Sequence, residues 1–200
     1  MMPRISLTDL VDVVSKAGSP KATKVRQIKN RQEYSPATDF YRPFREKLVA
    51  LHESNSPKNT LLNICSGLTD IKKIKAYPDI VEGYRKWWGN KNLNWFQPPS
   101  VLYSHLGMDV SVNPELGLSI NGEQHVIKLY LKDDEVNKAK MDLITALMEH
   151  CLRPKVTART MVGVLDVRGA KLYTLGTSAA AQKAIIDAEL AYIAALWPCV

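Results

Sequence analysis

The clearest pattern of apolar and polar side chains lies between residues 109 and 131. From Asp109 to Ile120 the two kinds alternate, and residues 126–131 form a second run that is rich in large apolar side chains. Alternation with a period of two is typical of a half-buried strand, and the intervening Asn121-Gly122 favours a two-residue type I′ turn. The pattern therefore predicts a β-hairpin.

A two-residue turn fixes which side chains face each other across this hairpin. The expected pairs are Leu116 with Ile127, Val112 with Leu131, and Glu115 with Lys128. This register puts the apolar positions of both strands on one face, whereas a slip of one residue would place them opposite polar partners. Pro114 has no backbone N–H, so we expect an edge, a bulge or a break in pairing at that residue.

Helical spacing dominates the first half of the chain. Ser6 can cap a first helix, with Asp9 at its third position. A second helix is expected over residues 36–53, and a later short one over residues 79–88, beginning after Pro78. Between these two helices, apolar residues recur at helical spacing with one interruption. They are Leu61, Leu62, Ile64, Leu68, Ile71 and Ile74.

The remaining pattern indicates the fold class. A helix is expected to start at Asp134 or Asn137, after the hairpin. The elements that follow it are strands at residues 160–167 and 170–175 and an Ala-rich helix at residues 178–196. The order of elements in the second half is therefore β-β-α-β-β-α, and the predicted fold class is α+β, with short helices preceding this sheet unit.

Turn-forming residues divide the chain near its middle. Residues 89–92 and 97–100 are rich in Gly, Asn and Pro, which favours a soft boundary near residue 99. It separates a helical, basic segment (residues 1–99) from a hairpin-centred α/β core domain (residues 100–200). The helices of the first part are short, so the two parts can also form one compact unit.

Positive charge is concentrated in the first half. The formal net charge is +7, with 17 Lys/Arg against 9 Asp/Glu in residues 1–100 and 10 against 11 in residues 101–200. Such asymmetry is a reason to consider nucleic acid or another polyanion as a partner. Five cations within residues 21–31 form either a phosphate-contacting arm or a solvated linker. They are Lys21, Lys24, Arg26, Lys29 and Arg31.

Cysteine spacing and hydropathy indicate the compartment. Cys65, Cys151 and Cys199 are odd in number, widely spaced and outside any CxxC motif, which is typical of thiols in a reducing compartment. No apolar stretch approaches the roughly 18 residues needed to cross a bilayer, and the first residues do not form a signal-peptide core. We therefore expect a cytoplasmic protein with no membrane partner.

The residues around the hairpin resemble a known family. Pro114-Glu115 in the first strand, Lys128 in the second, and the helix and strand that follow are similar to the core of the restriction-endonuclease-like (PD-(D/E)XK) nucleases, over about residues 100–175. The resemblance implies that Glu115 binds a divalent cation, Mg²⁺ or Mn²⁺, and that Lys128 is the catalytic lysine. The chain departs from the motif at Val126, where the family carries a second acid two residues before the lysine.

Four other acids lie near enough in the sequence to be candidates for the missing one. They are Glu123, Asp133, Asp142 and Glu149. The alternative interpretation of Glu115 and Lys128 is a cross-strand ion pair on a solvated sheet face, which contributes less than about 1 kcal/mol.

Two functions follow from these patterns. The first is a nucleic-acid-associated protein with a nuclease-like core whose metal site is incomplete or unconventional; if it is an enzyme, it is a metal-dependent nuclease that uses Glu115 and Lys128. The alternative is a non-catalytic protein-interaction or assembly module, in which the hairpin and the last helix are contact surfaces. Ionic strength separates the two, because binding through phosphates weakens steeply with salt.

Overall fold

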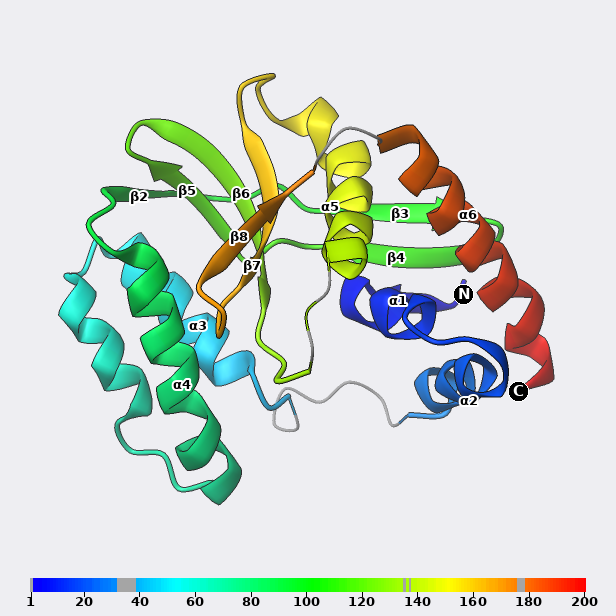
Figure 1. Cartoon of the computed structure of the whole chain (residues 1–200), viewed down its shortest axis with the longest axis horizontal. Coiled ribbons are helices and arrows are strands. Elements are labelled where there is room, and N and C mark those ends of the chain that lie inside the picture. Colours follow the sequence, from blue (N-terminus) through cyan, green and yellow to red (C-terminus); the bar gives the residue numbers. More distant parts are fainter. Residues whose placement is uncertain (1, 32–38, 135, 137, 176–178) are drawn as a thin grey trace.

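The computed structural model describes residues 2–31, 39–134, 136, 138–175 and 179–200, which form an α+β fold with two mixed sheets (Figure 1). The larger sheet has five strands in the order β2-β5-β6-β7-β8, and its β6–β7 pair is parallel. These strands are β2 (Leu93–Phe96), β5 (Leu116–Ile120), β6 (Glu123–Tyr130), β7 (Met161–Asp166) and β8 (Lys171–Thr174).

The smaller sheet has three strands in the order β1-β4-β3. Strand β1 (Arg4–Ser6) runs parallel to β4 (Met108–Val112), and β3 (Val101–His105) runs antiparallel to β4. The first residues of the chain therefore pair with a strand that begins about 100 residues later.

The helices surround these sheets. The α-helices are α1 (Leu7–Val14), α2 (Gly18–Lys29), α3 (Arg42–Glu53), α4 (Ile71–Trp88), α5 (Lys138–Leu152) and α6 (Ala179–Leu196). Short 3-10 segments are η1 (Lys58–Cys65), η2 (Arg153–Lys155) and η3 (Trp197–Cys199). Among the described residues, no helix has both the length and the apolar composition needed to cross a membrane.

Strand β6 separates two apolar cores. Val126 and Tyr130 pack into the core that α1, α5, α6 and the smaller sheet share, whereas Ile127 and Leu129 pack into the core formed by α3, η1 and α4. Successive side chains of a strand point to opposite faces, so a strand covered on both sides carries apolar residues at consecutive positions. In Figure 1, α3 and α4 accordingly lie on one side of the larger sheet and α5 on the other.

The predicted hairpin register is confirmed near the turn and wrong beyond Pro114. Leu116 faces Ile127 as expected. Val112 pairs with Val101 in the smaller sheet instead of with Leu131. The strand that the pattern treats as continuous is two strands in two sheets, because Pro114 cannot donate a ladder hydrogen bond and the chain changes direction there.

Three strands are missing from the prediction, so the order β-β-α-β-β-α is only partly right. β1, β2 and β3 have four residues on average and lie beside turn-forming sequences, and each is held by a partner that is distant or unrecognised in the sequence. Because β1 and β2 precede residue 99 and pair with strands that follow it, the two halves share both sheets. The division of the chain at residue 99 stays a prediction.

The sequence predicts that a helix begins just after Pro78, but Pro78 lies within α4. Tyr77, Ile80 and Tyr84 are fully buried along one side of α4, on both sides of the proline in sequence. Their burial offsets the roughly 3 kcal/mol that a proline costs inside a helix. The other predicted helices are observed as α1, α3, α5 and α6; residues 36–38, Asn137 and Ser178 of those predictions lie outside the described residues.

A buried histidine in the α3–α4 core should make stability depend on pH. His52 is 4% exposed, and its Nε2 lies 2.7 Å from the Tyr84 hydroxyl. Burial lowers the pKa of His52 from 6.5 to about 4, so the folded protein binds fewer protons than the unfolded chain between these values. Stability is then fully present above pH 6.5 and falls as the pH drops toward 4, by up to about 3 kcal/mol.

Urea unfolding at a series of pH values measures this effect. In His52→Gln the fall in unfolding free energy between pH 6.5 and 4 should be smaller than in the parent by most of that amount. An identical pH dependence in the variant and the parent would show that His52 does not cause it.

Candidate functional site

Charged side chains gather in a cleft of about 780 Å³ at the end of β6. Helix α1 and Arg31, two residues after the end of α2, form one wall. The start of α3 and the residues just before it form another wall, and the segments around Glu115 and β6 form the floor. The charged residues that line it are Asp9, Asp12, Arg31, Asp39, Arg45, Glu115, Lys128 and Lys132. With four acids and four bases, the formal charge of the lining is zero.

Glu115 and Lys128 lie side by side on the floor of this cleft, as the hairpin register predicts. Glu115 Oε1 accepts a hydrogen bond from Lys128 Nζ at 2.5 Å, and its Oε2 accepts one from the backbone N–H of Leu129 at 2.8 Å. The Lys128 ammonium also donates to the carbonyl of Asn113 at 3.2 Å. Both side chains are only 12% exposed, so the expectation of a solvated sheet face is wrong although the ion pair itself is present.

Backbone pairing with β6 extends to Glu115, just before β5. The Glu115 N–H donates to the carbonyl of Ile127 at 3.1 Å, whereas the carbonyl of Asn113, two residues earlier, accepts from the Lys128 ammonium. The Glu115 carboxylate accepts from Leu129 in place of a backbone carbonyl, which satisfies a donor that is otherwise buried beside the floor.

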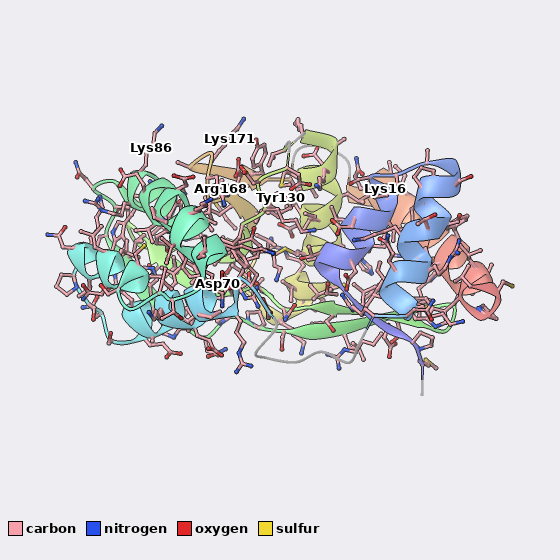
Figure 2. The ribbon with its side chains drawn as sticks, turned by 90° about the horizontal axis from the view of Figure 1, so that it is seen from below. Lys16, Asp70, Lys86, Tyr130, Arg168 and Lys171 are labelled. Atoms are coloured by element: carbon pink, nitrogen blue, oxygen red, sulfur yellow. The ribbon has the colours of Figure 1, made fainter. Side chains whose placement is uncertain are left out.

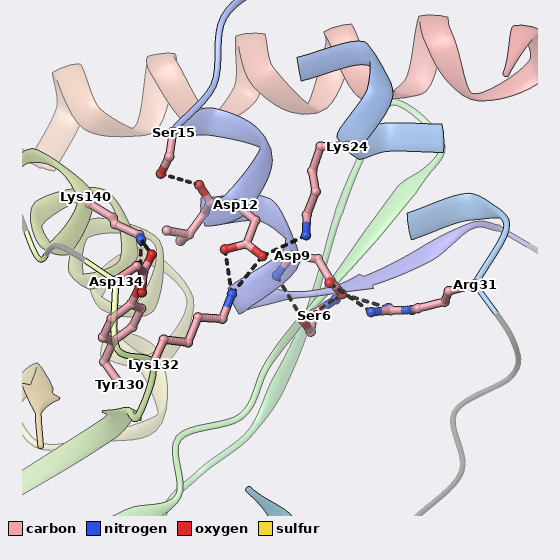
Figure 3. Close-up of polar contacts among 11 residues, drawn as sticks. Ser6, Asp9, Asp12, Ser15, Lys24, Arg31, Tyr130, Lys132, Asp134 and Lys140 are labelled. Carbon is pink, nitrogen blue, oxygen red and sulfur yellow. Dashed lines mark hydrogen bonds and ion pairs between the residues drawn. The ribbon is translucent and has the colours of Figure 1, made fainter. Parts of the chain in front are cut away.

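The N-cap of helix α1 holds Asp9, an acid in the wall of the cleft, in position. Ser6 and Asp9 form a reciprocal capping box, with the Ser6 hydroxyl accepting from Asp9 N and the Asp9 carboxylate accepting from Ser6 N. Arg31 donates to both Asp9 oxygens, at 2.9 and 2.8 Å (Figure 3). Burial opposes ionisation of Asp9, but the hydrogen bonds from Arg31 and Ser6 outweigh it and hold the pKa of Asp9 below its usual value.

Asp12, one turn further along α1, is shared by two lysines. Lys132 Nζ donates to its two oxygens at 2.7 and 2.8 Å, and Lys24 Nζ lies 3.0 Å from one of them. Figure 3 shows the two ammonium groups approaching this carboxylate from α2 and from the segment after β6. One negative charge therefore faces two positive charges at this point of the wall.

A second polar cluster, formed by Tyr130, Asp134 and Lys140, adjoins the cleft. The buried Lys140 donates to the Tyr130 hydroxyl and to Asp134, both at 2.6 Å, and Tyr130 donates to Asp134. Burial raises the pKa of Tyr130, and the bond to Asp134 raises it further. Burial opposes ionisation of Asp134, yet Lys140 and Tyr130 together lower its pKa. Lys128, Tyr130 and Lys132 are alternate residues of β6 and its extension, so they lie on the same face of the strand. This spacing is the feature of the sequence that indicates that Tyr130 lies near the cleft.

The predicted basic arm is a packed helix, and one of its five cations reaches the cleft. Arg31 lines it, whereas the other four are not part of its lining. Lys21 pairs with Glu189 at 2.7 Å, Lys24 pairs with Asp12, and Lys29 donates to the carbonyl of Trp197 at 2.7 Å. Arg26 is exposed and forms no ion pair among the described residues. Nucleic-acid contact by these five cations stays a prediction.

The residues around Glu115 do not fit the metal site that the family resemblance implies. Within the described parts of the chain, no group of three His, Cys, Asp or Glu side chains could hold a metal ion. Both Glu115 oxygens already accept hydrogen bonds from Lys128 and Leu129. Mg²⁺ usually takes one or two carboxylates in octahedral geometry, whereas Asp9, Asp12 and Asp39, the other described acids of the cleft, are paired with Arg31, Lys132 and Arg45.

The four candidate replacement acids lie outside the cleft. Asp142 pairs with Lys138 on α5, and Glu149 pairs with Arg153 at 2.7 Å. Asp133 is 86% exposed at its side chain and lies 4.0 Å from Arg168, and Glu123 is exposed at the turn end of β6. None of the four lines the cleft. The migration of an acid into the site is therefore not observed among the described residues.

Comparison with known proteins adds no family to this picture: the sequence matches no protein-family model and no curated protein. The observed structure is an α+β fold with mixed sheets, and the nuclease-like resemblance rests on the order of elements and on two residues.

Removing one partner of the Glu115–Lys128 pair should destabilise the fold, because a charge that is 12% exposed would lose its counter-charge. We expect Glu115→Ala to lower the free energy of unfolding by about 2–3 kcal/mol, and the double variant Glu115→Gln/Lys128→Met to recover part of the loss. Urea unfolding measures both.

The exposed pair of Arg42 and Glu46 on α3 is the matched control, since its side chains are 34% and 61% exposed. Glu46→Ala should cost less than about 0.5 kcal/mol. Equal losses at the two sites would mean that the Glu115–Lys128 pair contributes no more to the free energy of unfolding than a surface ion pair does.

Proposed function

We propose that this chain associates with nucleic acid through the charged cleft, on a nuclease-like core that does not cut it. The observation that carries the proposal is that residues predicted separately, Arg31 from the basic run and Glu115 with Lys128 from the hairpin, line the same cleft. Arg45 and Lys132 add two further cations at its walls.

The order of elements supports the nuclease-like part of the proposal. Hairpin β5–β6 is followed by α5 and then by β7, which runs parallel to β6. In a core of this kind, Glu115, just before β5, would be the acid and Lys128 in β6 would be the lysine. A fold of this type does not by itself carry an activity, so the residues of the cleft decide what it does.

The cations of the cleft differ in how accessible they are to a phosphate group. The side chains of Arg31, Lys132 and Arg45 are 53%, 33% and 28% exposed, against 12% for Lys128. Each is paired with a carboxylate of the same cleft, so a bound phosphate has to replace that carboxylate. This exchange makes binding moderate in affinity and sensitive to salt.

The floor of the cleft favours binding without hydrolysis. Lys128, the residue that would stabilise developing charge, is neutralised by Glu115 and bonded to a carbonyl. Both Glu115 oxygens already accept hydrogen bonds, and the described residues contain no group of three His, Cys, Asp or Glu side chains that could hold a metal ion.

Removal of a cation from the cleft should weaken nucleic-acid binding, and removal of the carboxylate that pairs with it should strengthen binding. Lys132→Gln or Arg45→Gln should weaken binding of labelled single- or double-stranded DNA or RNA about fivefold, as expected for one charge acting through water at about 4 Å. Asp12→Asn, which frees Lys24 and Lys132, should strengthen it by a similar factor. Fluorescence anisotropy across a salt series provides the affinities.

Salt dependence identifies the phosphate contacts. The slope of log affinity against log salt should fall by about one for each cation removed from the cleft. Lys86 and Lys171 project from the surface in Figure 2 and line no part of the cleft, so Lys86→Gln and Lys171→Gln are controls that should leave the slope unchanged. Equal effects of cleft and control variants would place the contact elsewhere.

Incubation of the same DNA and RNA with Mg²⁺ or Mn²⁺ should leave them intact. Gel analysis of the products tests this. Metal-dependent cleavage that disappears in Glu115→Ala would contradict the non-cutting core and assign a nuclease to this cleft.

A further inference from the structure

Helix α4 carries apolar side chains both on its buried face and on its exposed surface. Tyr77, Ile80 and Tyr84 are buried against the larger sheet and α3, as expected for an amphipathic helix. Ile71 and Ile74 are large aliphatic residues in the first turns of α4, yet they are 70% and 47% exposed. Their helical spacing predicts burial, and the protein leaves them in contact with solvent.

These exposed residues form a single stripe. Ile71, Ile74 and Pro78 are separated by three and four residues, so they lie one above the other along the same face of the helix. Pro78 is also exposed. Leu62 in η1, a segment packed on α4, is a further exposed aliphatic residue, at 51%. In Figure 1 the start of α4 projects at the lower left, away from both sheets.

Positive charge flanks this stripe. Lys72 and Lys75 are exposed and form no ion pair among the described residues. Lys75 is four residues after Ile71 and therefore lies beside the stripe. Two acids lie close by in sequence, and each has a partner. The Asp70 carboxylate caps α4, accepting from Lys72 N at 2.8 Å and from Lys73 N at 3.3 Å, and Asp79, four residues after Lys75, lies 3.5 Å from Arg168. Cations in the first turn also oppose the helix macrodipole, so these lysines do not stabilise the isolated helix.

We infer that this face of α4 docks an acidic amphipathic helix of a protein partner. Aliphatic side chains on the partner would cover Ile71, Ile74 and Pro78, and its carboxylates would pair with Lys72 and Lys75. Charge complementarity sets the sign of the partner, and the apolar stripe distinguishes it from nucleic acid, whose phosphate backbone offers nothing to bury two isoleucines. The patch is small, so the contact is a transient one.

This docking face is separate from the cleft of the proposed function. The cleft is lined by residues of α1, α3, β6 and the segments next to them, and by none of α4. Its lining does not include Leu62, Ile71, Lys72, Ile74 or Lys75. The inference therefore stands or fails independently of nucleic-acid binding, and the two can be tested with different variants of the same protein.

The test uses a fluorescein-labelled helical peptide with leucines at i, i+3, i+4 and i+7 and glutamates elsewhere, titrated with the full chain. Ile71→Ser/Ile74→Ser and Lys72→Glu/Lys75→Glu should each weaken binding about tenfold or more. A peptide with serine in place of leucine, and one with lysine in place of glutamate, should both bind more weakly than the first peptide. Lys132→Gln, in the cleft, should have no effect.

Matched controls separate this face from general surface effects. Ile185 on α6 is 46% exposed, beside the Lys183–Asp187 pair, so Ile185→Ser should not change peptide binding. Lys86→Glu/Lys171→Glu controls for net charge. Peptide binding that is unchanged in both α4 variants would overturn the inference. So would anionic vesicles or DNA that bind the full chain more tightly than the peptide and lose that binding in Ile71→Ser/Ile74→Ser.

Discussion

The backbone nitrogen of Pro114 carries no hydrogen, and at this residue the chain leaves the smaller sheet and enters the larger one. A strand cannot continue its ladder through such a position without losing a hydrogen bond. The direction change places Val112 in one core and Leu116 in the other, and it opens the floor on which Glu115 and Lys128 meet. Pro114 therefore lies where the two sheets, the two cores and the cleft meet.

Charge in the cleft is balanced locally rather than accumulated. Asp9, Asp12, Asp39 and Glu115 each hold a cation of the same cleft, so the net charge of +7 is carried by other parts of the surface. A polyanion that enters must compete with protein carboxylates, which favours reversible association over tight capture. The same local pairing compensates the charge of Lys128 inside a mostly buried contact.

Local features of the sequence predicted local features of the structure. The Asn121-Gly122 turn gave the β5–β6 register and the contact between Glu115 and Lys128, and Ser6 with Asp9 gave the start of α1, because each depends on residues close together in the chain. Strands β1 and β3 were missed because their pairing partner β4 was assigned to the other sheet. The contact of Asp12 with Lys132 joins residues 120 positions apart, and no periodicity reports such a pair.

The parallel pairing of β1 with β4 has a consequence for synthesis on the ribosome. Residues 4–6 leave the ribosome about 100 residues before residues 109–111, with which they pair, and α6, which completes the same core, emerges later still. Strand β1 and helix α1 must therefore wait for β4 while about 100 residues are synthesised, a time of roughly 5 to 20 s at ordinary elongation rates. The core around α3, η1 and α4 needs β5, β6 and β7 but not α6, so it can close earlier. The nascent chain should consequently gain protection from proteolysis in two stages, with its first residues among the last to be protected.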